Sequence, residues 1–279
     1  MRCPHFTLAF ALLAAAALAA CSHGRPDGPD RPAFRAQINF GDSLSDVGTY
    51  AVGAIAGLGG GKFTINGDAT ARDPALTGKI WTELMAAKLD LPPPCPAQTG
   101  LEGDPAQGLR VPVVNHPRCF GYAQGGSRVT HPIGAGNART GSAVGALTLP
   151  VAGQVANHLA AAGGSFRGDE LVFVMAGAND VLMQAAAPAP EAVAAVATAA
   201  DELAALVRKQ ILGRGANYVV VVNVGDIAST PHGRSQPPRE RALIKTMVST
   251  FNTRLKAGVA GDSRVVYVDF FSLVRDQVA

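Results

Sequence analysis

The sequence has 279 residues, of which 48% are hydrophobic and 16% charged, and its formal net charge is +3. This length suffices for one sizeable α/β domain or two small ones. The basic residues are scattered and are not interleaved with aromatic residues, which argues against nucleic acid as a partner. The six histidines and four cysteines have no zinc-type spacing, so we expect neither a metal site nor a cofactor.

The N-terminal residues have the pattern of an export signal. An apolar run over residues 8–20 is too short to span a bilayer as a stable helix, which predicts a signal peptide over residues 1–20. Small residues before Cys21 resemble the lipobox of bacterial lipoproteins, in which this cysteine is lipidated. The resemblance implies an exported lipoprotein at the outer membrane or periplasmic face, anchored in the membrane through Cys21. The alternative is an ordinary secretory signal and a secreted protein.

Residues 21–35 are rich in proline, glycine and charge, which predicts a tether. Two cysteines remain beyond it, Cys95 and Cys119. In an oxidising compartment we expect them to form a disulfide, worth roughly 3 kcal/mol in the chain-entropy estimate. Two buried free thiols are the alternative.

A short apolar run over residues 36–40 predicts a strand that turns sharply through Gly41. Residues suited to the first turn of a helix follow, so we expect a helix to start after Ser43. A serine at such a turn can be a nucleophile, because helix N–H groups stabilise a developing anion. It can equally be a plain helix cap, since Asp42, Ser43 and Ser45 are all good caps.

The rest of the chain alternates between helix and strand patterns. The Gly-rich run at 53–61 predicts neither a regular helix nor a strand, and the stretch before His116 reads as irregular. Apolar runs without alternation predict strands that are buried on both faces. Such strands, separated by amphipathic helices, predict a three-layer α/β fold with a doubly wound parallel sheet. We expect helices at 78–89, 150–162, 191–212, 239–259 and from 270, and strands at 171–176, 218–224 and 265–269, with a short strand near 120.

Three predicted strands end in turns of small and polar residues: Gly41 to Ser43, Gly125 to Ser127, and Gly177 to Asp180. Ligands of such sheets bind at the carboxyl ends of the strands, so these turns should converge. A hydroxyl, a backbone N–H and a carboxamide would then surround one point, which suits acyl transfer. Taken singly, each turn has an ordinary explanation as a bend or a cap.

The three turns together resemble the first three sequence blocks of the GDSL esterases and lipases, also called SGNH hydrolases. Residues 40–46 read FGDSLSD, residues 122–127 read YAQGGS and residues 177–180 read GAND. The resemblance implies a five-stranded flavodoxin-like sheet in a domain over residues 36–279, and hydrolysis of carboxylic esters without a metal. It assigns Ser43 as nucleophile and oxyanion N–H donor, and Gly126 and Asn179 as further oxyanion donors.

The sequence departs from the family at its last block, an Asp-x-x-His that supplies the base and its carboxylate partner. No such motif occurs, and no histidine follows His232. We therefore expect a domain truncated at its C-terminal end, with little or no esterase activity in these 279 residues. His232 is a possible substitute base, or simply a loop residue, and Asp42 and Asp46 are possible auxiliary residues. The alternatives to an enzyme of ester or lipid substrates are a non-catalytic envelope lipoprotein and a lipid acyltransferase.

Overall fold

The structure, a computed structural model, describes residues 32–63 and 78–278. The predicted signal peptide and Cys21 lie outside these residues. The strands are β1 (Ala36–Gly41), β2 (Gln98–Glu102), β3 (Arg110–Asn115), β4 (Glu170–Met175), β5 (Tyr218–Val222) and β6 (Val265–Val268). The helices are α2 (Gly53–Gly57), α3 (Trp81–Lys88), α4 (Val151–Ala161), α5 (Ala178–Ala186), α6 (Ala192–Leu206), α7 (Pro231–Ser235), α8 (Pro238–Val259) and α9 (Phe270–Val278), with short 3₁₀ or π turns at Pro105–Gln107, Ala138–Thr140, Val207–Ile211, Leu212–Arg214 and Ile227–Ser229.

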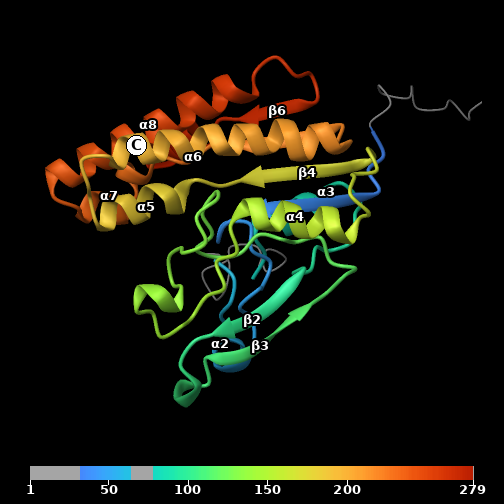
Figure 1. The fold of residues 1–279 in the computed structure, drawn as a ribbon, viewed down its shortest axis with the longest axis horizontal. Helices are drawn as coiled ribbons and strands as arrows, with labels where there is room; N and C mark the ends of the chain where they lie inside the picture. Colours follow the sequence, from blue (N-terminus) through green and yellow to red (C-terminus); the bar gives the residue numbers. More distant parts are fainter. Residues whose placement is uncertain (1–31, 64–77, 279) are drawn as a thin grey trace, which may run out of the picture. The chain divides into compact units, whose positions relative to one another are not determined.

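A parallel sheet in the order β1-β4-β5-β6 carries the fold (Figure 1). The apolar runs that predicted its strands pair in register, with Ile38 opposite Val172 and Val172 opposite Val219. The described residues form four strands in this sheet rather than five. Gly121 takes the fifth place through a single parallel bridge to Asn39. With that bridge counted, the order is flavodoxin-like, and the predicted fold class is confirmed.

One face of the sheet carries the main hydrophobic core. Ile38, Phe40 and the in-register valines of β4 and β5 point to this face and are buried against α4, α6 and α8. The apolar stripe of α6 that the sequence predicted, which includes Val196 and Leu203, faces this core. Because strand side chains alternate, the residues between them point to the other face. There Trp81 of α3 packs edge-on against Phe173, with ring centroids 5.1 Å apart.

An antiparallel hairpin of β2 and β3 extends beyond the sheet (Figure 1). It lies in the stretch that the sequence analysis took as irregular. The predicted disulfide joins Cys95, which precedes the hairpin, to Cys119, which follows it. This bond and the bridge between Pro96 and Gly121 hold the base of the hairpin against the segment that runs beside β1.

Two local predictions near Ser43 are wrong. Residues 42–50 form turns and bends instead of a helix, and the first helix after β1 is α2. The side chain of Asp42 accepts the N–H of Leu44 at 3.1 Å, and such local bonds compete with helix formation. Conversely, the Gly-rich run contains α2, a five-residue helix whose Ile55 packs beside Tyr50 and Leu101.

No helix in the described ranges combines the length and the hydropathy needed to cross a bilayer.

Candidate functional site

Ser43 lies half-buried in the turn that follows β1. The chain can turn there because Gly41 has no side chain: a Cβ would lie 2.2 Å from the carbonyl oxygen of Met175. Asp42 then stabilises the turn, since its carbonyl accepts the N–H of Ser45 at 3.0 Å and its side chain accepts that of Leu44. Within the described part of the chain, neither the N–H nor the hydroxyl of Ser43 has a hydrogen-bond partner. Both are available to a ligand.

Gly126 presents a second available N–H. Its φ of +81° is left-handed, and a Cβ would lie 2.0 Å from the carbonyl oxygen of Ala135, so no other residue fits. Its N–H is also without a partner among the described residues. The preceding residue, Gly125, lies next to the nucleophile candidate: a Cβ built on it would be 3.7 Å from the Cβ of Ser43.

Asn179 lies in the first turn of α5, which begins directly after β4. Its side chain is 6% exposed and donates one amide N–H to the carbonyl of Ser127 at 2.9 Å. That bond fixes the carboxamide beside the second turn. The second N–H of the same amide group is left as a possible donor to a ligand. The helix can begin this tightly because Gly177 is left-handed and lies against the ring of Phe251.

Asp46 ties the first turn to the second. Its Oδ2 accepts the N–H of Gly125 at 2.9 Å, while Oδ1 accepts the N–H groups of Gly48 and Thr49 at 2.9 and 2.7 Å. The residue is 2% exposed. Because buried carboxylates with three N–H donors are strongly held, Asp46 sets the distance between Ser43 and Gly126.

Gln154 of α4 was missed by the sequence analysis, although it is fully buried at the centre of the site. Its Oε1 accepts the N–H of Gly41 at 2.9 Å, and its Nε2 lies 2.8 Å from the carbonyl oxygen of Gly41, 2.9 Å from that of Leu149 and 3.2 Å from the hydroxyl of Ser127. It therefore connects the end of β1 to the second turn. The available signal was a glutamine on the apolar face that Val151 and Val155 define.

The third turn is joined to the second by an ion pair. Asp180 accepts Nε–H of Arg128 and the N–H of Val129, both at 3.1 Å, and the carboxylate is almost completely buried. Tyr50, also missed, adds a further link: its hydroxyl donates to the carbonyl of Gly125 at 2.9 Å and accepts the N–H of Thr148 at 3.2 Å. The three turns thus form one hydrogen-bonded unit.

Burial dominates the electrostatics of the site. Asp42 is 1% exposed, and burial raises its pKa from an ordinary 3.8 to about 7, with smaller contributions from the charges of Asp180 and Asp46. Burial likewise raises the pKa of Asp180, against the opposing effect of the Arg128 guanidinium. The surroundings of Ser43 therefore disfavour negative charge on fixed side chains. The N–H groups of Ser43 and Gly126, which no described residue accepts, can stabilise an anion that forms there.

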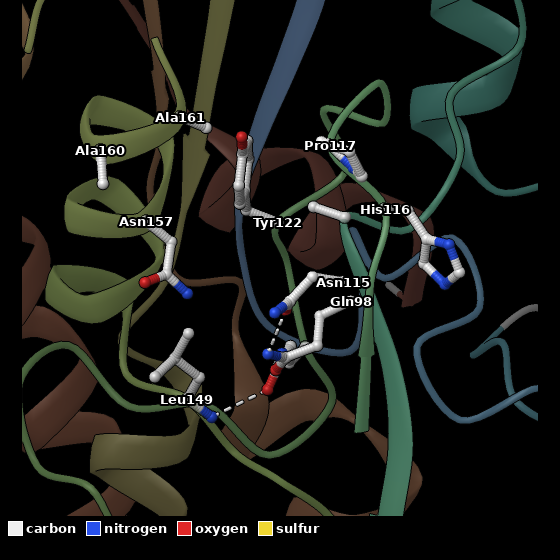
Figure 2. Close-up of a pocket in the computed structure, with 11 residues that line it drawn as sticks. Gln98, Asn115, His116, Pro117, Tyr122, Leu149, Asn157, Ala160 and Ala161 are labelled. Atoms are coloured by element: carbon white, nitrogen blue, oxygen red, sulfur yellow. Dashed lines mark hydrogen bonds between the residues drawn. The ribbon is translucent and has the colours of Figure 1, made fainter. Parts of the chain in front are cut away.

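A cavity of about 230 Å³ opens in front of Ser43. Its walls combine the first two turns with apolar side chains, notably Ile55 and Phe63, and with Lys62, which bonds Glu83 at 2.7 Å. A larger cavity of about 440 Å³ lies between the hairpin and α4, and Ser43 does not line it (Figure 2). Among the described residues, no group of three His, Cys, Asp or Glu side chains could hold a metal ion.

None of the four described histidines hydrogen-bonds Ser43 within the described ranges. His232 lies exposed in α7, and His131 is exposed and bonds the backbone of Ile133. His116 lies 2.9 Å from the hydroxyl of Thr99, and His158 is buried beside Tyr122. The structure therefore gathers the nucleophile and oxyanion candidates but does not bring His232 into the hydrogen bonding around Ser43.

Comparisons with known proteins place the sequence in a family. The chain matches, with 14% identity and a TM-score of 0.38, the structure of a variant of an acetyl xylan esterase from Geobacillus stearothermophilus, over 87% of this chain and 79% of that one. No curated protein matches the sequence. The family model for GDSL-like lipase/acylhydrolase matches residues 38–277, which covers all three turns and the whole sheet except the first two residues of β1. This chain belongs to the GDSL-like lipase/acylhydrolase family.

Proposed function

We propose that this protein is a serine-dependent carboxylic ester hydrolase that works through an acyl-enzyme on Ser43. The observation that carries the proposal is the pair of N–H groups, of Ser43 and Gly126, that have no hydrogen-bond partner among the described residues and lie on turns that Asp46 holds together. Buried N–H groups in proteins are nearly always paired, so two available donors beside an available hydroxyl indicate a site for an oxyanion.

The chemistry follows from these positions. The Ser43 hydroxyl attacks the ester carbonyl, and the N–H groups of Ser43, Gly126 and Asn179 hold the oxyanion of the tetrahedral intermediate. Collapse of that intermediate releases the alcohol and leaves the acyl group on Ser43, from which water then removes it. The cavity in front of Ser43, lined in part by Ile55 and Phe63, would receive the acyl or alcohol portion of an ester or lipid substrate.

The proton on Ser43 needs a base, and none is hydrogen-bonded to it in the described part of the chain. Loss of the histidine from a serine triad typically costs on the order of 10⁶ in rate. We therefore propose that these 279 residues hydrolyse esters slowly, if at all, and that a histidine must be supplied for full activity. The same observation supports a second candidate, a non-catalytic envelope lipoprotein that keeps the fold for binding.

We further propose that the protein is exported and held at a membrane by a lipid on Cys21, or secreted if that cysteine is unmodified. The support is the apolar run of residues 8–20, which ends at Cys21. Mass spectrometry of the mature protein from its host distinguishes the two: a diacylated N-terminal cysteine supports the anchor, and an unmodified N-terminus after residue 20 or nearby contradicts it.

The catalytic proposal is tested by labelling with a fluorophosphonate probe, with and without added imidazole. Imidazole is the side-chain group of histidine and can enter a cavity of this size, so it should accept the serine proton as a histidine base would. We expect slow labelling that imidazole accelerates, on Ser43 alone. Ser43→Ala should abolish labelling. Ser45→Ala, which removes a buried hydroxyl without a hydrogen-bond partner in the described structure, should leave it unchanged.

Two outcomes contradict parts of the proposal. Rapid labelling without imidazole would show that the chain already contains an effective base. Absence of labelling in both conditions, from a folded protein, would favour the non-catalytic lipoprotein.

A further inference from the structure

A groove runs along the edge of the sheet, outside the Ser43 cavity. Two cavities, of about 440 and 470 Å³, share Pro117, Tyr122 and Ala161 in their walls and therefore lie side by side. We call the two together the edge groove. Figure 2 shows its first half, where Asn157, Ala160 and Ala161 of α4 face the side chains of Gln98 and Asn115.

The edge groove follows the segment that runs beside β1. The carbonyl of Phe120 accepts the N–H of Asn39, and the N–H of Gln124 reaches the carbonyl of Gly41 at 3.2 Å, so this segment is parallel to β1. One end of the groove is therefore at Gln124, two residues before Gly126. The other end is at Arg35, which precedes β1. The groove leads from the amino end of the sheet toward the serine turn.

The half near Gln124 is lined by four carboxamides and by His116, and by no Asp, Glu, Lys or Arg side chain. Three of them form a relay: Leu149 N–H donates to Gln124, Gln124 to Gln98, and Gln98 to Asn115, each at 2.9 Å. The relay ends on Asn115, whose own N–H₂ group has no partner in the described chain. The side chain of Asn157, across the groove, has none there either. Carboxamides both donate and accept, which is the pattern that hydroxyl groups match.

The half near Arg35 is cationic. Arg35, Arg118 and Arg167 line it, and none of the three guanidinium groups has a hydrogen-bond or carboxylate partner among the described residues. The one carboxylate there, Glu170, instead accepts the backbone N–H groups of residues 167 and 168. His158 closes the floor, and its buried Nε2 is likewise unpartnered in the described part of the chain. Guanidinium groups bind carboxylate and phosphate through paired N–H donors.

We propose that the edge groove binds a saccharide chain that carries anionic groups, with its hydroxylated rings against the carboxamides and its carboxylate or phosphate groups against the three arginines. A lipid would fit the groove less well. Its head group could reach the arginines, but an acyl chain over the other half would leave four carboxamides facing a hydrocarbon. The groove does not include Ser43, so binding is independent of the chemistry proposed for that residue.

The test uses the full chain with Ser43→Ala, so that the result does not depend on ester hydrolysis. Isothermal titration with tetragalacturonate, with a phosphorylated glucose oligomer and with neutral maltotetraose compares ligands with and without charge. We expect at least one anionic ligand to bind about tenfold more tightly than maltotetraose in about 0.1 M salt, and this difference to shrink in about 1 M salt. Preference between the two anionic ligands identifies the carboxylate or the phosphate as the recognised group.

Two sets of variants locate the binding. R35Q/R118Q/R167Q should weaken anionic ligands about tenfold or more and leave maltotetraose unchanged. The control variant R110Q/R139Q/R239Q removes the same total charge at three exposed arginines elsewhere and should have no effect on binding. N115A/N157A should weaken the anionic and neutral saccharides alike. Thermal denaturation checks that each variant is folded.

The proposal is overturned if all three saccharides bind equally or not at all, or if both triple-arginine variants behave alike. It is also overturned if vesicles of phosphatidylglycerol bind through the three arginines while the saccharides do not, because the groove would then be a lipid site.

Discussion

Asp42→Asn should remove a pH dependence of stability that the buried carboxyl group imposes. The substitution keeps an oxygen that can accept the N–H of Leu44, so the turn at Ser43 should survive. In the wild type, burial raises the pKa of Asp42 from 3.8 to about 7. Between these values the folded protein holds a proton that the unfolded chain has released. Its stability therefore falls as the pH rises through this window.

The size of the effect follows from the two pKa values. A rise from 3.8 to about 7 corresponds to about 4 kcal/mol at about 1.4 kcal/mol per pH unit. We expect the free energy of unfolding of Asp42→Asn, minus that of the wild type, to increase by about this amount from pH 4 to pH 8. His158 also titrates abnormally, but it is common to both proteins and cancels in the difference. Asp180 and Asp46 interact with Asp42 through their charges, and these contributions to its pKa are smaller than that of burial.

Urea denaturation at a series of pH values measures this difference directly. Asp169→Asn, the same chemical change at an exposed position, is the control for the loss of one carboxyl group. The reasoning is refuted if the Asp42→Asn difference is flat, because Asp42 would then be ionised in the folded protein like an exposed carboxyl group.

Three further predictions concern the framework of the site. Gln154→Leu removes the two hydrogen bonds that this carboxamide makes to the N–H and the carbonyl of Gly41 and should cost about 2–4 kcal/mol of stability, measured by denaturation, with a matching loss of fluorophosphonate labelling in imidazole. Gly126→Ala should destabilise by about 2 kcal/mol or more, because a left-handed φ and a carbonyl 2.0 Å away exclude a Cβ; a melting temperature equal to the wild type contradicts this. Cys95→Ser with Cys119→Ser should cost roughly 3 kcal/mol, and added reductant should lower the stability of the wild type but not of this variant.

The strands of the sheet and the long helices that cover it could be predicted because buried strands and helix faces have recognisable patterns of apolar residues. The apolar runs that became β4 and β5 contain few polar residues, because protein packs against both faces of these strands and neighbouring strands pair with their edges. The hairpin was missed for the opposite reason. β3 is largely exposed and contains Pro112, and β2 bends at Gly100, so neither shows an alternating pattern.

The three turns of the candidate site could be predicted from the sequence, but the hydrogen bonds that join the turns could not. Ser43, Gly126 and Asn179 stand in short blocks with recognisable residue types. Gln154 acts from a helix 113 residues after Gly41, and such a long-range bond leaves no local signature. The prediction of a helix after Ser43 was wrong because Asp42, which suits a helix cap, can also stabilise a turn by accepting the N–H of Leu44.

The central claim, that the three turns form an oxyanion hole around Ser43, is tested most directly by a crystal structure of the protein labelled by a fluorophosphonate in imidazole. The account predicts phosphorus bonded to the Ser43 hydroxyl oxygen, and a phosphonyl oxygen about 2.7–3.1 Å from the N–H nitrogens of Ser43 and Gly126 and from Nδ2 of Asn179. A phosphonyl oxygen that points to solvent, with the Gly126 N–H still unpartnered, would contradict it.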